Sequence, residues 1–169
     1  MKPNKEIRYH LLISKDTSMC GPAFWKRKYN TDVTNRFLTA VQATKETRLR
    51  IMNFKILHNI WPTNILLKRM KLKPSENCEK CNVKDYIEHF FFHCKQIRSL
   101  WHYVKTFIIN ETGCIIKIDE QTALLGIDDT THPNVNKNDI STINRILLLA
   151  KVCISKFRYG QQRNINDIF

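Results

Sequence analysis

The stretch CEKCNVKDYIEHFFFHC, residues 78–94, is the most informative part of this sequence for the fold. It holds three of the six cysteines and two of the six histidines of the chain. Cys78 and Cys81 form a CxxC turn, which directs two sulfurs toward one point, and a helix beginning a few residues before His89 brings His89 and Cys94 around to close a tetrahedron. Three thiolates and one imidazole suit zinc. The spacing predicts a small CCHC zinc knuckle with one structural Zn²⁺, because four protein ligands leave no open coordination position.

Three other interpretations fit the same residues. His93 can replace Cys94, because His89 and His93 lie one helical turn apart. The CxxC pair can be a redox dithiol, although no strand and turn precede it as in a thioredoxin fold. Finally, the cysteines can be small buried residues that bind no metal. Spacing alone leaves these alternatives open.

Composition bounds the class of protein. The chain has 169 residues with 43% apolar content, which is enough for one sizeable core. The N-terminal stretch MKPNKEIRYHLLISKD is too charged for a signal peptide, and no apolar run of about 18 residues is present. We therefore expect an intracellular protein, in the cytoplasm or nucleus, with no membrane partner. In that compartment thiols stay reduced, so the isolated Cys20, Cys114 and Cys153 are expected to be buried or half-buried residues.

The basic charge is concentrated before the cysteine cluster. The formal net charge is +13, and residues 1–76 carry 16 Lys and Arg against 5 Asp and Glu. Residues 77–110 carry 5 against 3, and residues 111–169 carry 7 against 7. This uneven distribution favours a surface that faces phosphates, whereas the simpler alternative is that these side chains are solvated faces of helices.

The periodicity predicts a mainly α fold in which a helical hairpin precedes the knuckle. Residues 1–30 read as irregular, and a helix capped by Asp32 or Thr34 runs to about Thr44. In KETRLRIMNFKILHNI, residues 45–60, an apolar face predicts a second helix that ends at a proline. The next helix, NILLKRMK, forms a tight hairpin with it. The faces of the first two helices comprise Val33, Phe37, Leu38 and Val41, and then Leu49, Met52, Phe54, Ile56, Leu57 and Ile60.

A second helical region is predicted toward the C-terminus. Asp139 caps a helix with an apolar stripe typical of a core helix. The stripe comprises Ile140, Ile143, Leu147, Ala150, Ile154 and Phe157. Before it, CIIKI at 114–118 is a candidate short strand, and residues 161–169 are read as a frayed tail.

A set of residues between 45 and 103 forms a recognisable pattern: Phe54, Lys55, Ile56, Leu57, His58, Pro62, Thr63, Asn64, Cys78, Cys81, His89, Phe90, Phe91, Cys94 and Trp101. With these residues, the region 45–103 resembles the zinc-binding region that follows the reverse transcriptase domain in non-LTR (LINE-type) retrotransposon polyproteins. The resemblance extends weakly through ALLGI at 123–127 and the helix at 143–160. The last metal ligand of that family is a cysteine, so the resemblance favours Cys94 over His93. Ile87 stands where the family often has Thr.

The resemblance implies a piece of a polyprotein with three segments: a basic segment with a helix at 1–44, the zinc-binding domain at 45–110, and a C-terminal helical segment at 111–169. The reverse transcriptase domain of the parent polyprotein is then a partner. Polymerases of this kind use paired aspartates to hold metal ions. The only adjacent pair, Asp128 and Asp129, is flanked by turn residues, so we expect no enzyme activity and no small-molecule substrate.

The leading hypothesis is a zinc module that binds RNA or DNA, because zinc knuckles hold single strands through bases and phosphates. The alternative is a structural or protein-interaction module, of which a degenerate retrotransposon remnant is one version. Trp61 is either a hydrophobic pin or a stacking residue. The candidate nucleic-acid contacts are Arg48, Arg50, Lys55, Lys68, Arg69, Lys71, Lys73, Lys80, Lys84, Trp61 and Tyr86.

Overall fold

The computed structural model describes residues 21–160, and this part of the chain is mainly helical, which confirms the predicted fold class. The predictions for residues 1–20, Cys20 among them, and for 161–169 lie outside the described residues. Within 21–160 there is no β-strand, so the strand predicted at 114–118 is wrong: this segment is an unpaired connection. The elements are α2 (Gly21–Tyr29), α3 (Thr34–Gln42), α4 (Thr47–Leu57), α5 (Asn64–Arg69), the π turn η1 (His89–His93), the 3-10 turn η2 (Lys95–Ile97), α6 (Arg98–Thr112), α7 (Glu120–Leu125) and α8 (Lys137–Arg158).

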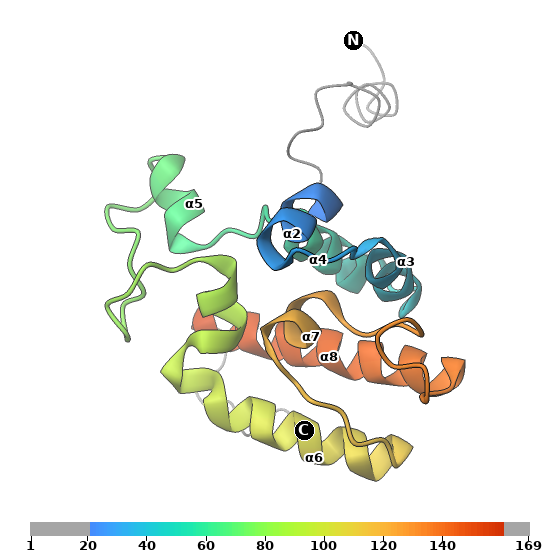
Figure 1. Cartoon of the computed structure of the whole chain (residues 1–169). Helices are drawn as coiled ribbons and strands as arrows, with labels where there is room; N and C mark the ends of the chain where they lie inside the picture. The colour runs from blue at the N-terminus through green and yellow to red at the C-terminus, as the bar shows by residue number, and fades with distance from the viewer. Residues whose placement is uncertain (1–20, 161–169) are drawn as a thin grey trace.

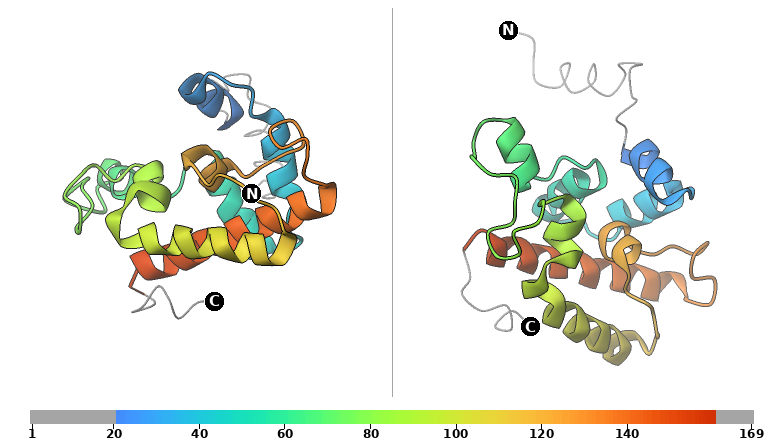
Figure 2. Two further views of the ribbon diagram at one scale, coloured as in Figure 1. Left: turned by 60° about the horizontal axis from the view of Figure 1, so that its bottom comes forward. Right: turned by 60° about the vertical axis from the view of Figure 1, so that its left-hand side comes forward.

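Helix α8 is the centre of the fold. Helix α6 lies beside it and runs in the opposite direction, while α3 and α4 pack against it from another side (Figures 1 and 2). The short helix α7 contacts α3, α4 and η1. One continuous apolar core extends from Trp25 to Ile154, so the helices before and after the knuckle are joined by the same buried cluster.

The apolar stripe predicted for α8 is buried except at its last member. Ile143, Leu147, Ala150 and Ile154 are all fully buried, whereas Phe157 is only partly covered. A stripe at this spacing lies on one side of a helix, so a single long helix can line the core from end to end.

The N-cap of α8 is Asn136 rather than the predicted Asp139. The Asn136 side chain accepts a hydrogen bond from the Asp139 backbone N–H at 2.9 Å. Asp139 lies in the first turn, where a negative charge favours the helix.

Helix α2 occupies a segment that the sequence predicted as irregular. Gly21 and Pro22 open the helix, which is consistent with proline's tolerance in a first helical turn. Trp25 is fully buried, and its indole Nε1–H donates to the Leu57 carbonyl oxygen at 2.7 Å. A Cβ on Gly21 would lie 2.3 Å from the same oxygen, so only glycine allows α2 to approach the end of α4 this closely.

Helices α4 and α5 follow one another as predicted, but they do not form a tight hairpin. Helix α4 packs against α3, α7 and α8, whereas α5 stands apart from it beside the knuckle (Figure 1). Phe54 and Ile60, predicted on the apolar face, are 45% and 48% exposed, and Leu38 of α3 is 58% exposed. The hydrophobic pattern identified these helices but overestimated the width of their buried faces.

The loop after α7 is held by a side chain of α8. The Asn144 side chain accepts from the Ile127 N–H and donates to the Ile127 carbonyl, both at 2.8 Å. Gly126 has φ 79 and ψ −165, and a Cβ there would lie 2.3 Å from Asn144 Oδ1. The glycine therefore lets the chain pass close enough for this double hydrogen bond.

None of the helices between residues 21 and 160 has the length and apolar character needed to cross a lipid bilayer.

Candidate metal centre

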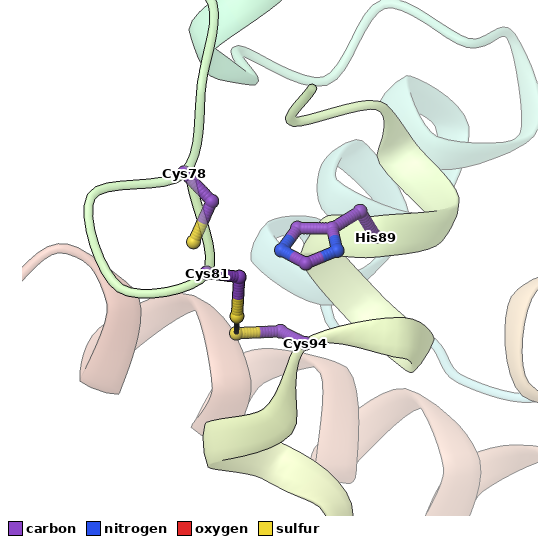
Figure 3. Close-up of side chains that lie close together, drawn as sticks. All are labelled: Cys78, Cys81, His89 and Cys94. Atoms are coloured by element: carbon purple, nitrogen blue, oxygen red, sulfur yellow. Dashed lines mark hydrogen bonds between the residues drawn. The ribbon is translucent and has the colours of Figure 1, made fainter. Parts of the chain in front are cut away.

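A tight turn places the first two cysteines. The Cys78 N–H donates to the Val83 carbonyl at 2.8 Å, and the Asn82 N–H donates to the Cys78 carbonyl at 2.9 Å. Asn82 has φ 54, a left-handed conformation that asparagine tolerates better than most residues. This closed turn brings Cys78 and Cys81 to the same side of the loop (Figure 3).

The last two predicted ligands lie at the two ends of the π turn η1: His89 is its first residue, and Cys94 follows its last. A π turn is wider than the α-helix that the sequence predicted here. The Cys94 N–H donates to the His89 carbonyl at 3.0 Å, a bond that spans five residues. In a regular α-helix, at about 100° per residue, side chains five positions apart point roughly 140° away from each other. The wider turn and the extended backbone of Cys94 turn both side chains toward the CxxC sulfurs.

The four side chains form a compact cluster. One ligand atom from each of Cys78, Cys81, His89 and Cys94 lies within 4.8 Å of all the others, and Cys81 Sγ is 3.7 Å from Cys94 Sγ (Figure 3). Two sulfurs that bind one tetrahedral zinc at about 2.3 Å are separated by about 3.8 Å. The cluster therefore has the size and the nitrogen and sulfur donors that fit a metal ion of the zinc type.

His89 contributes the observation that best supports metal binding. Its Nε2 is buried and has no hydrogen-bond partner among the described residues. A buried polar nitrogen without a partner is costly unless a ligand satisfies it. Burial also lowers the pKa of His89, which favours the neutral imidazole that binds metals.

His93, the alternative fourth ligand, lies away from the cluster. It is 53% exposed, and its Nε2 is 2.5 Å from Glu120 Oε2. The structure thus groups Cys94, and not His93, with the other three side chains.

The thiols of Cys78 and Cys94 have pKa values shifted in opposite directions. Burial raises the pKa of the Cys78 thiol, but the N–H groups of Lys80 and Cys81 and the Arg158 guanidinium outweigh it and hold the pKa below its ordinary value. Burial dominates at Cys94 and raises its pKa to about 11. Cys78 is therefore predisposed to the thiolate form that binds metals.

Hydrogen bonds of Pro62 and Asn64 explain part of the sequence Pro62-Thr63-Asn64, which contributes to the resemblance. Asn64 donates its side-chain N–H to the Asn77 carbonyl at 2.8 Å, and its backbone N–H donates to the buried Asp85 at 3.3 Å. The Pro62 carbonyl accepts from the Tyr159 hydroxyl at 3.0 Å. These bonds connect the start of α5 to the knuckle and to the end of α8.

Trp61 is packed as a hydrophobic pin. Its ring lies 5.4 Å from Phe91, 6.1 Å from Phe90 and 6.3 Å from Tyr159, measured between centroids. Tyr86, the other aromatic candidate, is 52% exposed.

The nine basic candidates divide into two groups. Lys68 and Lys84 pair with Glu76, and Lys73 pairs with Glu79. The remaining six are exposed and have no ion-pair partner within residues 21–160; they are Arg48, Arg50, Lys55, Arg69, Lys71 and Lys80.

A cationic groove along α6 was not predicted. It has a volume of about 630 Å³ between α6 and the 115–118 segment. Its lining combines basic, aromatic and aliphatic side chains, and none of the described lining residues is acidic; they are Phe92, His93, Arg98, Trp101, His102, Lys105, Ile115, Ile116, Lys117 and Ile118. Arg98, His102 and Lys105 recur at helical spacing, which is the sequence signal that identifies the groove in retrospect.

The aspartate pair is not arranged as a metal-binding dyad. Asp128 is buried, and its Oδ1 accepts hydrogen bonds from Thr130 Oγ1, the Thr131 N–H and Thr131 Oγ1 at 2.9, 2.9 and 2.6 Å. Asp129 is exposed. Asp128 therefore stabilises a local turn.

A comparison with models of known families matches residues 15–101 to the family described as zinc-binding in reverse transcriptase. This match covers just over half of the 169 residues, and the chain belongs to that family. The family and the Cys and His cluster together indicate a metal site, with zinc as the metal. Neither the curated proteins nor the solved structures contain a significant match.

Proposed function

We propose that this chain is a nucleic-acid-binding module of a non-LTR (LINE-type) reverse transcriptase polyprotein, built around one structural zinc held by Cys78, Cys81, His89 and Cys94. The ligand set supports a structural role, because four protein ligands complete a tetrahedral shell. The turn-stabilising contacts of Asp128 argue against a role of the Asp128–Asp129 pair as a polymerase metal site.

The observation that carries the proposal is the groove along α6. It is lined by His93, which precedes Cys94 in the chain, by Arg98 and Lys105 of α6, and by Lys117 of the 115–118 segment. Arg98, Lys105 and Lys117 have no ion-pair partner within residues 21–160, so their charges are available to phosphates. A groove lined with cations is the arrangement that follows the backbone of a single strand.

Salt-dependent binding tests this function. Fluorescence anisotropy with labelled single-stranded RNA and DNA should show affinity that falls steeply between about 50 and 200 mM salt, because binding releases counterions. The double variant Arg98→Ala/Lys105→Ala should weaken binding and reduce the steepness of log K against log salt by about 1.4, because each phosphate contact to a single strand contributes about 0.7. The matched control is Lys137→Ala/Arg145→Ala, which removes two exposed charges of α8 that do not line the groove.

The competing function is a structural or protein-interaction module that docks to the reverse transcriptase domain. Ile60, Met70, Leu72 and Val83 are each at least 48% exposed, and contact with another protein would remove their apolar surface from water. Binding that does not change with salt would favour this second function. An equal loss of affinity in the groove variant and its control would favour it too.

A further inference from the structure

The last turn of α8 reaches the metal cluster through one side chain. Arg158 Nη1 lies 3.0 Å from Cys78 Sγ and 3.2 Å from Cys94 Sγ, and Nη2 donates to Asp85 Oδ1 at 2.6 Å. The Arg158 side chain is only 8% exposed. This arginine follows Cys94 by 64 residues and lies outside the family match at 15–101. We propose that Arg158 is a positioning residue of the metal centre, which binds two of its thiolates and makes the end of α8 part of the zinc site.

Charge balance is the first argument for this role. A divalent ion with three thiolates and a neutral imidazole carries one net negative charge. A buried negative charge needs a nearby cation or hydrogen-bond donors. Among the described residues, Arg158 is the cation whose donors contact these sulfurs. The guanidinium therefore supplies both the compensating charge and two N–H···S hydrogen bonds.

Asp85 orients the guanidinium toward the sulfurs. Its side chain is fully buried; one carboxylate oxygen accepts from Arg158, and the other accepts from the Asn64 N–H at 3.3 Å. Because both oxygens of the Asp85 carboxylate are hydrogen-bonded, the carboxylate has a fixed orientation, and it fixes the direction of the Arg158 guanidinium. Such outer partners of metal ligands typically contribute about 10- to 100-fold in metal affinity.

The planar fork of arginine suits this position. The guanidinium carbon lies 4.6 Å from the centre of the Phe90 ring, and Phe90 follows the ligand His89 directly. Stacking on the ring and three hydrogen bonds from one plane are within the geometry of a guanidinium, whereas the ammonium of lysine is a point charge on a flexible chain. A lysine at 158 should therefore keep the charge but lose the contact with at least one thiol.

The test measures metal binding by the full chain, with no nucleic acid present. Zinc affinity is determined by competition with a chromophoric chelator, and Co²⁺ is used as a spectroscopic substitute. Arg158→Gln should weaken zinc binding by about 10- to 100-fold. Arg158→Lys should fall between this variant and the native chain. The sulfur-to-cobalt charge-transfer band should retain its intensity, because three thiolates remain, but move to lower energy, because two N–H···S bonds are lost.

Two controls separate a positioning role from simple docking of α8. Arg145→Gln removes an exposed charge from the same helix. Tyr159→Phe removes a hydrogen bond of the same turn to the Pro62 carbonyl without contact to sulfur. Both controls should leave the band energy unchanged. A zinc affinity of Arg158→Gln within about twofold of native, or an equal loss in Tyr159→Phe, would overturn the inference.

If Arg158→Gln does not fold, the same measurements of zinc affinity and of the cobalt charge-transfer band are made on Arg158→Lys, and they test the proposal in its place. Because no nucleic acid is used, the result is independent of the proposed binding function.

Discussion

The indole Nε1–H of Trp101 donates to the Phe91 carbonyl at 2.8 Å, so the start of α6 holds the π turn that carries His89. Phe91 is fully buried, and water does not replace a lost donor easily at such a site. Trp101 is one of the residues that carry the resemblance to the zinc-binding region, and this bond gives that position a physical reason.

Replacing Trp101 should therefore affect stability and metal binding together. Trp101→Phe leaves the Phe91 carbonyl without its donor, and we expect the free energy of unfolding to fall by about 1–3 kcal/mol, with weaker zinc binding. Urea unfolding and chelator competition measure the two effects. Trp25→Phe is the matched control, since it removes an indole bond of the same kind at Leu57, away from the metal cluster, and should leave zinc affinity unchanged. A native zinc affinity in Trp101→Phe would show that the π turn does not need this support.

The fourth ligand is decided by two single variants. Cys94→Ser should abolish stoichiometric zinc in the purified protein, whereas His93→Ala should retain one zinc per chain, because His93 faces Glu120. Elemental analysis of both variants and the native chain gives the answer. The reverse pattern would assign the site to His93, and a folded native protein without zinc would remove the ligand assignment altogether.

Two glycines with positive φ should respond very differently to alanine. Gly113 ends α6 with φ 68, and a Cβ added there would meet no atom within 4 Å, so Gly113→Ala should cost about 1–2 kcal/mol of stability. Gly126 occupies a region that only glycine adopts readily, and its Cβ would collide with Asn144 Oδ1. We expect Gly126→Ala to cost at least about 3 kcal/mol in urea unfolding. An equal loss of unfolding free energy in the two variants would mean that Asn144 can move away from the new Cβ at little cost. That result would contradict a stabilising role for its two hydrogen bonds to Ile127.

The buried Lys151 should make stability depend on pH. Burial lowers its pKa to about 7, and its Nζ donates to the Leu124 carbonyl at 3.0 Å. The unfolded chain, with the ordinary lysine pKa near 10.5, then binds more protons than the folded chain between these two values. Stability contributed by this group therefore rises with pH above about 7, by up to about 1.4 kcal/mol per pH unit.

The variant Lys151→Met isolates this effect. Native and variant proteins are unfolded in urea between about pH 7 and 9, and the native chain should gain stability relative to the variant as pH rises. The exposed Lys156 of the same helix provides the control, because Lys156→Met should leave the slope unchanged. Parallel pH profiles for native and Lys151→Met would mean that the buried amine stays charged.

Local patterns in the sequence predicted the parts of the fold that depend on local spacing. The stripe of α8 and the spacing from Cys78 to Cys94 are each visible within one segment. Helix α2 was missed because Gly21 and Pro22 resemble loop residues, although the same pair opens a helix when Trp25 finds a buried site on α4.

The remaining differences arise from packing between distant segments. The tight hairpin was wrong because α3, α7 and α8 occupy the surfaces of α4, and no local signal reveals that competition. Arg158 was not predicted as part of the site for the same reason: a basic residue in the last turn of a helix has an ordinary local explanation, and its contacts depend on the whole fold.

The contact between Arg158 and Cys94 also sets an order of events during synthesis. At about 5–20 residues per second, a ribosome adds the 64 residues between them in roughly 3–13 s. During that interval the nascent chain already carries all four candidate ligands but lacks the cation that lies against two of the sulfurs. Metal captured at that stage would be held by an unfinished site, and its final retention would be determined only when α8 has docked.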